Sequence, residues 1–211
     1  MLDGSEFMNK ALQRLRQQMH SSVFPKRATL LVVIMLGGVF CINAAFSDES
    51  FHINQDVLKK AADKWGKEAS SRLTSWESLV RSDKSESDTE KLEKVNSFMN
   101  RTMAYAEDVD IWGVRDYWAT PLEFIGRGSG DCEDYAIAKY FTLKAMGFPD
   151  EKLNIAYVKA LRLNRFHMVL TYVNKPGDEP LVLDNLNDSI KPATERHDLA
   201  PIFSFNGTDL W

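Results

Sequence analysis

Residues 128–140 decide the fold, and they read Gly128-Ser129-Gly130-Asp131-Cys132-Glu133-Asp134-Tyr135-Ala136-Ile137-Ala138-Lys139-Tyr140. The first four of these residues favour a turn, because glycine adopts backbone conformations that other residues avoid. From Cys132 to Met146 the apolar residues recur with helical spacing, and Gly147 followed by Pro149 is typical of a helix end. The stretch therefore predicts a glycine-rich turn followed directly by a helix that begins at Cys132.

Cys132 is expected in the first turn of that helix, where a thiol is readily activated. Unpaired N–H groups and partial positive charge at a helix N-terminus lower the pKa of a thiol placed there. The N–H of Cys132 is also a candidate donor to an oxyanion. The alternative is a buried structural cysteine. The only other cysteine, Cys41, lies in an apolar N-terminal run, so a disulfide framework is excluded.

Upstream of this stretch the sequence is mainly helical. An apolar stripe at four-residue spacing predicts one or two amphipathic helices from Ile53, Val57, Ala61, Trp65, Ala69 and Leu73 to Trp76 and Val80. A further helix is expected from about Asp88 to Met103, whereas residues 104–119 show no period. Thr120-Pro121-Leu122-Glu123 predicts the capped start of a short helix.

Downstream of Gly147 the pattern changes from helices to strands. Residues 153–160, 165–173 and 181–184 are rich in β-branched and aromatic side chains, and residues 202–205 favour one more strand. Residues 175–180 form a turn cluster of proline, glycine and acidic residues. Helices followed by a meander of strands predict an α+β fold with an antiparallel sheet.

A nucleophilic cysteine needs a base and a group that orients the base. His167 lies in a predicted strand, whereas His197 lies in a polar stretch and His52 near the start of the domain. Asp184 ends the next apolar strand, and a hairpin centred on the intervening turn would place it roughly opposite His167. Its alternative role is that of an ordinary strand-end aspartate. We predict Cys132 as nucleophile, His167 as base and Asp184 as its orienter.

The residues around Cys132 resemble the signature of the bacterial transglutaminase-like cysteine proteinases. The resemblance is carried by Thr120-Pro121-Leu122-Glu123-Phe124 and by residues 128–140, and it extends from about residue 50 to the C-terminus. It implies a papain-like or transglutaminase-like core, with the nucleophile on a helix N-terminus packed on an antiparallel sheet. The histidine and aspartate of the family pattern fall on His167 and Asp184.

The same resemblance implies a biological role that residue patterns do not reveal. Enzymes of this kind are calcium-dependent endopeptidases of the Gram-negative periplasm. They cut the N-terminal region of a large cell-surface adhesin near a pair of alanines and so control biofilm attachment. An inner-membrane receptor for cyclic di-GMP sequesters them. Two other classes stay open: a transglutaminase or amidase using the same thioester chemistry, and a non-catalytic binding module.

Three carboxylates beside the nucleophile are candidate calcium ligands. Asp131, Glu133 and Asp134 offer the oxygen atoms that calcium prefers. Alternatively, acids at a helix N-terminus only complement the helix dipole. Three negative charges would raise the pKa of Cys132, and a bound divalent cation would relieve that repulsion.

The N-terminal residues 1–47 are expected to lie outside the folded domain. Residues 2–7 are consistent with a cloning remnant, and Lys26-Arg27 precedes an apolar run over residues 28–42. This pattern is typical of a secretory signal with cleavage near residues 45–47, or of an uncleaved anchor. Bulky Phe40 before Cys41 argues against lipid attachment. Residues 48–211 are predicted to form a single domain.

Composition places the chain among globular proteins and argues against a nucleic-acid partner. It has 211 residues, of which 44% are hydrophobic and 27% charged, with a net charge of -4. Binding to phosphates requires a clustered basic surface, and the sequence has no stripe rich in lysine and arginine.

Overall fold

The computed structural model describes residues 51–82 and 85–207. The predicted cloning remnant and signal segment within residues 1–47 lie outside the described residues. Within these residues, every helix is too short or too polar to cross a membrane.

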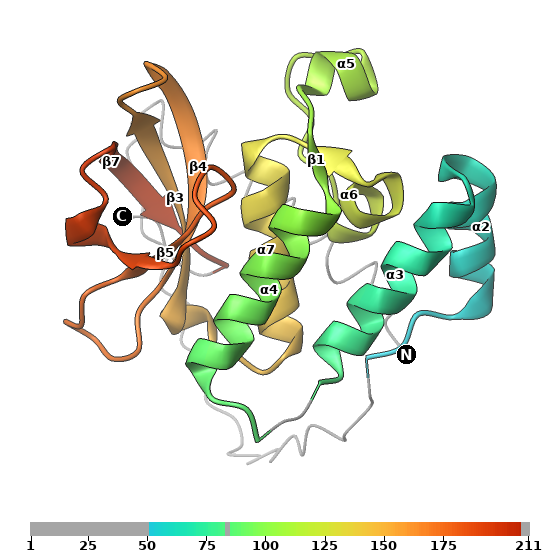
Figure 1. Ribbon diagram of the computed structural model, residues 1–211, viewed down its shortest axis with the longest axis horizontal. Coiled ribbons are helices and arrows are strands. Elements are labelled where there is room, and N and C mark those ends of the chain that lie inside the picture. Colours follow the sequence, from blue (N-terminus) through green and yellow to red (C-terminus); the bar gives the residue numbers. More distant parts are fainter. Residues whose placement is uncertain (1–50, 83–84, 208–211) are drawn as a thin grey trace, which may run out of the picture.

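The N-terminal half of the domain is helical, as the apolar stripes predicted (Figure 1). Two helices, α2 (Gln55–Trp65) and α3 (Lys67–Val80), meet at Gly66, so the long stripe is two helices rather than one. Helix α4 (Asp88–Thr102) begins with a capping box between Ser87 and Glu90. Three shorter elements follow: strand β1 (Ala104–Tyr105), helix α5 (Asp108–Trp112) and helix α6 (Pro121–Arg127).

Helix α6 begins at the capping pattern that Thr120-Pro121-Leu122-Glu123 predicted. The Thr120 side chain accepts a hydrogen bond from the Glu123 N–H at 3.2 Å, and the Glu123 carboxylate accepts one from the Thr120 N–H at 3.0 Å. This reciprocal capping box starts the helix. Gly128, with φ +83°, ends it in a left-handed conformation that favours glycine.

The five strands that follow residue 152 form one antiparallel sheet in the order β6-β5-β4-β3-β7. Strands β3 (Leu153–Ala160) and β4 (Arg165–Tyr172) are the longest, and β5 (Leu181–Leu183) pairs with the end of β4. Strand β6 (Lys191–Pro192) lies at one edge and β7 (Leu199–Phe205) at the other. Two short 3-10 turns, Asp150–Lys152 and Ala193–Glu195, precede β3 and follow β6. The sheet is not a simple meander, because the last strand returns to pair with β3.

Helix α7 (Cys132–Ala145) packs against the sheet and also against α4, which runs in front of it in Figure 1. One core cluster fills the space between these elements, with Ile137, Leu170 and Leu183 among its buried members. A second cluster joins α2, α3 and α6 and includes Trp76 and Phe124. Because α7 contributes to both clusters, its first residue is held firmly between the helical half and the sheet.

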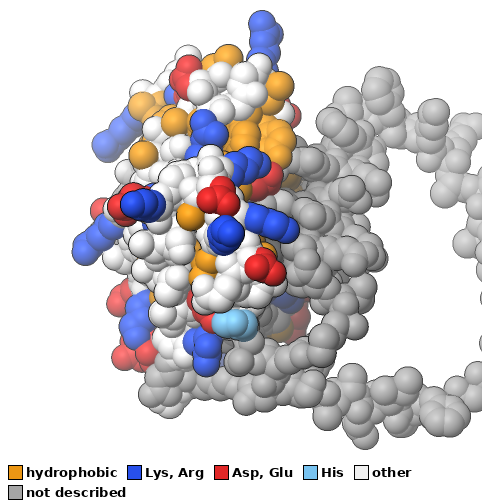
Figure 2. Space-filling view, turned by 90° about the vertical axis from the view of Figure 1, so that its right-hand side faces the viewer, with side chains coloured by type: hydrophobic (Ala, Val, Ile, Leu, Met, Phe, Trp, Pro, Cys, Tyr) orange, Lys and Arg blue, Asp and Glu red, His pale blue; other side chains and the backbone are white. Residues whose placement is uncertain are grey.

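These elements confirm the predicted α+β class. The additions are α5, β6 and the short parallel pair of β1 with β2 (Ser129–Gly130), which local sequence patterns did not indicate. On the face of the helical half shown in Figure 2, acidic and basic side chains alternate rather than gathering into one basic patch.

Candidate active site

The turn before Cys132 is held by backbone pairing and by close packing. Strand β2 pairs with β1, with Ala104 opposite Ser129 and Tyr105 opposite Gly130. A Cβ on Gly130 would lie 2.6 Å from a ring carbon of Phe124, so no larger residue fits there without displacement. Cys132 then occupies the first position of α7, where the sequence placed it.

His167, on the central strand β4, and Asp184, just beyond the end of β5, are brought together close to Cys132. Nε2 of His167 lies 2.7 Å from Oδ1 of Asp184, and both residues are buried. They lie two residues out of register, which agrees with the roughly opposite placement expected from the hairpin. The register pairs Leu170 with Leu183, so the ladder ends before Asp184 and this residue reaches His167 diagonally.

Several groups fix Asp184 just beyond the end of β5. Its backbone carbonyl accepts a hydrogen bond from Nδ2 of Asn100 on α4 at 2.7 Å. Its Oδ1 also accepts from the Leu186 N–H at 2.9 Å, and its Oδ2 pairs with Nη2 of Arg196 at 2.6 Å. Burial alone would raise the pKa of Asp184, but hydrogen bonds and charge from His167, with Leu186 and Arg196, lower it to about 2. Asp184 is therefore a firmly ionised partner for the imidazole.

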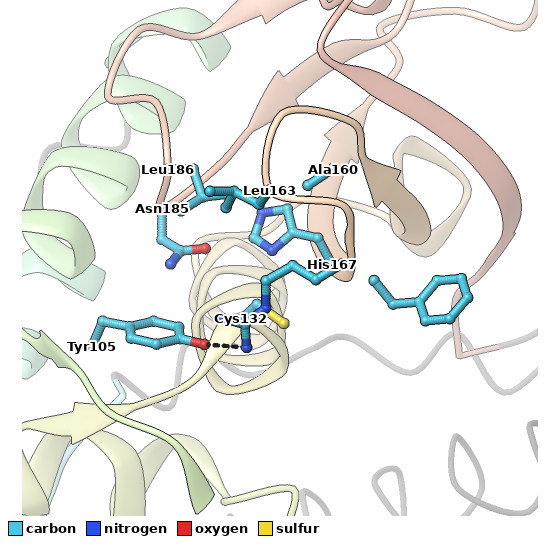
Figure 3. Close-up of a pocket in the computed structure, with 9 residues that line it drawn as sticks. Tyr105, Cys132, Ala160, Leu163, His167, Asn185 and Leu186 are labelled. Atoms are coloured by element: carbon cyan, nitrogen blue, oxygen red, sulfur yellow. Dashed lines mark hydrogen bonds between the residues drawn. The ribbon is translucent and has the colours of Figure 1, made fainter.

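A pocket of about 160 Å³ opens beside the thiol. Figure 3 shows Cys132 and the His167 ring at this pocket, with Tyr105 approaching from the helical half. The other lining residues are Ala160, Leu163, Arg165, Phe166, Asn185 and Leu186. Arg165 of β4 reaches across to the helical half, where it pairs with Glu107 at 2.6 Å. A peptide bond entering the pocket would therefore meet the thiol and the imidazole together.

The remaining described histidines are far less suited to act as bases. His52 is exposed and pairs with Glu77 at 2.7 Å, and His197 is exposed near the start of β7. His167, in contrast, is only 4% exposed and shares the pocket with Cys132. The geometry thus favours the histidine that the strand pattern selected.

The environment of Cys132 differs from the simple helix-terminus expectation. Burial raises the pKa of the Cys132 thiol, and the charges of Glu133 and Asp131 raise it further. The Sγ atom donates a hydrogen bond to Oε2 of Glu133 at 3.1 Å. Desolvation and carboxylate repulsion therefore oppose the helix dipole at this thiol, as the three acidic neighbours in the sequence indicated.

The acidic residues around Cys132 belong to a larger cluster than the sequence indicated. Carboxylate oxygens of Asp108, Asp131 and Asp134 lie within 4.8 Å of one another, and all three residues are buried. Glu133 belongs to two neighbouring groups of the same kind, one with Asp131 and Cys132, the other with Asp108 and Asp116. Asp108 and Asp116 were missed because they lie in the stretch without periodicity, where an acidic segment was the only signal.

This cluster fits a divalent cation. One oxygen each of Asp108, Asp131 and Asp134 is buried without a hydrogen-bond partner. Burial, reinforced by neighbouring Glu133, raises the pKa of Asp131 to about 10, and burial raises that of Asp134 to about 8. Buried carboxylate oxygens that lie close together without donors are costly, and calcium takes oxygen ligands of this type. The predicted ligands Asp131 and Asp134 therefore converge, and Asp108 joins them.

Comparison with known proteins places these features in a family. The family model of bacterial transglutaminase-like cysteine proteinases matches residues 67–197. The chain belongs to this family of cysteine proteinases. No curated protein matched the chain.

Solved structures of LapG from Legionella pneumophila are similar to this chain over most of its length. One is 45% identical with a TM-score of 0.66, over 74% of this chain and 86% of that chain. A calcium-bound LapG structure has the same identity and TM-score over 75% of this chain and 87% of that chain. An EGTA-treated LapG structure matches with the same identity and TM-score over 74% and 83%. The family and these structures agree with the expected class of enzyme and fold.

Proposed function

We propose that this chain is a calcium-dependent cysteine endopeptidase whose catalytic residues are Cys132, His167 and Asp184. The observation that supports it best is the buried His167–Asp184 pair in the pocket that also contains Cys132. A nucleophile at a helix start, with a base and an orienter on neighbouring strands, is the arrangement that acyl-transfer chemistry requires.

The hydrogen bond to Asp184 supports a different role for each ring nitrogen of His167. Asp184 binds Nε2, which leaves Nδ1 to accept the proton of the Cys132 thiol. The thiolate attacks the carbonyl carbon of the scissile peptide bond, and His167 returns the proton to the departing amine. The resulting thioester is cleaved when His167 takes a proton from water, whose oxygen attacks the carbonyl and releases the Cys132 thiolate. The N–H of Cys132 supports the oxyanion.

Asp108, Asp131 and Asp134 are the residues proposed to hold calcium, with Glu133 beside them. The bound ion would supply positive charge that offsets the carboxylates next to the thiol. With the ion held between them, Asp108 on α5 and Asp131 and Asp134 at the start of α7 would join these two helices and so help to set the position of Cys132. LapG, a relative with 45% identity, has been solved with calcium bound, which supports this assignment.

The proposed substrate is the N-terminal region of a large cell-surface adhesin, cut near a pair of alanines. Release of that adhesin would control biofilm attachment. The proposed location is the periplasm of a Gram-negative bacterium, and the proposed regulator is an inner-membrane cyclic di-GMP receptor that sequesters the protease. These proposals rest on the similarity to LapG and on the signal-like pattern before residue 48.

Incubation of the protein with N-terminal fragments of exported adhesins from the same organism tests this function. We expect one cut near an alanine pair with calcium, and none with EGTA or with Cys132→Ala. A fragment with the alanine pair replaced by two aspartates serves as the matched substrate control. Incorporation of a labelled amine without a cut would instead identify a transglutaminase, and cleavage by Cys132→Ala would exclude the proposed nucleophile.

A further inference from the structure

Arg196 connects the candidate triad to the turn before β7. The residue is 3% exposed, and its guanidinium lies between two carboxylates. Its Nη2 is 2.6 Å from Oδ2 of Asp184 and 2.8 Å from Oδ2 of Asp198, while Nε lies 2.9 Å from Oδ1 of Asp198. Arg196 was not among the residues selected from the sequence, because nothing in its local pattern distinguishes it from a surface arginine.

We propose that Arg196 is a positioning residue for catalysis, which acts by holding Asp184 so that Oδ1 faces His167. This inference rests on the proposed triad. Asp184 lies beyond the last ladder pair, Leu170 with Leu183, so sheet pairing does not fix its side chain. A carboxylate held through one oxygen can still rotate, and a second partner on the other oxygen removes that freedom. Arg196 is the side chain that binds this second oxygen.

The geometry requires an arginine rather than any cation. The guanidinium is a planar fork, and it binds Asp198 through two nitrogens while Nη2 also binds Asp184. Asp198 is only partly buried, and it binds the guanidinium of Arg196 from the side that faces solvent. The positive charge of Lys139 on α7 also attracts Asp184, but the two residues form no close ion pair. A lysine at position 196 would keep the positive charge but lose the simultaneous hydrogen bonds to Asp184 and Asp198.

The reactivity of Cys132 tests the proposal without any substrate. The probe is iodoacetamide, whose iodide is displaced by the thiolate, and peptide mapping by mass spectrometry reports the modified fraction of Cys132. We expect Arg196→Met to react about 10- to 100-fold more slowly than the wild type, because misplaced catalytic groups cost factors of this order. Arg196→Lys should recover part of that loss.

A double mutant separates positioning from general damage. Asp184→Asn should slow the reaction to a similar extent, and Arg196→Met/Asp184→Asn should be no more than about twofold slower than Asp184→Asn alone, since both act through one group. Asn206→Ala is the matched control, because Asn206 is equally buried but binds Asp150 near the opposite end of β3 from the pocket. It should lower thermal stability while leaving the rate per folded molecule unchanged.

Each outcome has a distinct meaning. Rates are divided by the folded fraction from circular dichroism, so unfolding cannot imitate a positioning effect. Wild-type reactivity in folded Arg196→Met or Arg196→Lys, with Asp184→Asn slow, would overturn the role of Arg196 alone. Multiplied losses in the double mutant would also overturn it. If neither His167→Ala nor Asp184→Asn slows the reaction, the proposed triad itself fails.

Discussion

Nε2 of His167 lies 2.7 Å from Oδ1 of Asp184, although the sheet register offsets the two residues diagonally. The pair exists because β5 ends at Leu183, which frees the next residue to turn towards β4. Asn100 and Arg196 then fix its backbone and its second oxygen. An imidazole orientation suited to Cys132 therefore depends on three separate parts of the chain.

Asp184→Asn should reduce cleavage by about 10⁴-fold without unfolding the domain, because an amide can hold the imidazole in the wrong tautomer. Steady-state kinetics on an adhesin fragment, with the folded fraction checked by circular dichroism, measure this effect. Asp178→Asn is a useful control, since Asp178 lies in the exposed turn before β5 and accepts a hydrogen bond from the Lys175 N–H. Full activity in Asp184→Asn would reduce Asp184 to a structural residue.

The low pKa of Asp184 predicts an acid-dependent loss of stability. Its folded pKa is about 2, below the value of about 3.9 for an unfolded aspartate, so the unfolded state binds the proton more readily. The stabilisation is complete above the unfolded pKa and is lost as pH falls towards 2, and it amounts to about 2 to 3 kcal/mol. Urea unfolding between pH 6 and pH 2 should show a shallower acid slope in Asp184→Asn. Identical slopes would contradict the assignment.

His167→Ala should be nearly as damaging as loss of the nucleophile, whereas His197→Ala should be almost silent. The reason is that His167 is buried in the pocket and paired with Asp184, while His197 is exposed. Cleavage rates of the two variants under identical conditions give the comparison. The reverse ranking would move the base to His197.

Calcium should stabilise the wild-type protein through the acidic cluster. At a concentration 100-fold above the dissociation constant, the melting temperature should rise by about 5 to 10 °C, which corresponds to about 2.7 kcal/mol. Asp108→Asn should lose most of this shift, because one buried ligand oxygen becomes a neutral amide. Asp110→Asn, an exposed acid on the same short helix, should keep it. An undiminished shift in Asp108→Asn would remove Asp108 from the site.

Local sequence patterns were sufficient to predict the elements that carry Cys132 and His167 and those next to them. Capping residues defined the start of α6, glycine punctuation placed Cys132 at the start of α7, and β-branched and aromatic residues revealed β3 and β4. Each of these signals arises within one element. Patterning therefore indicated the fold class, and chemistry indicated which cysteine and histidine to pair.

The missed features all depend on contacts between distant parts of the chain. Strands β1 and β2 have two residues each and exist only because they pair with one another. Asp108 joins Asp131 only after α5 folds over the start of α7. Arg196 resembles a surface residue until the turn before β7 buries it against Asp184. No periodicity or spacing in the sequence indicates these long-range contacts directly.

The central claim is that Cys132 forms a thioester with the N-terminal product of a cut protein. Acid quenching during cleavage of an adhesin fragment, followed by mass spectrometry, should detect that product on Cys132 with a mass equal to the free acid minus water. The adduct should be present with calcium, and EGTA or Cys132→Ser should abolish the thioester. Absence of any adduct on Cys132, together with undiminished cleavage by Cys132→Ala, would contradict the account.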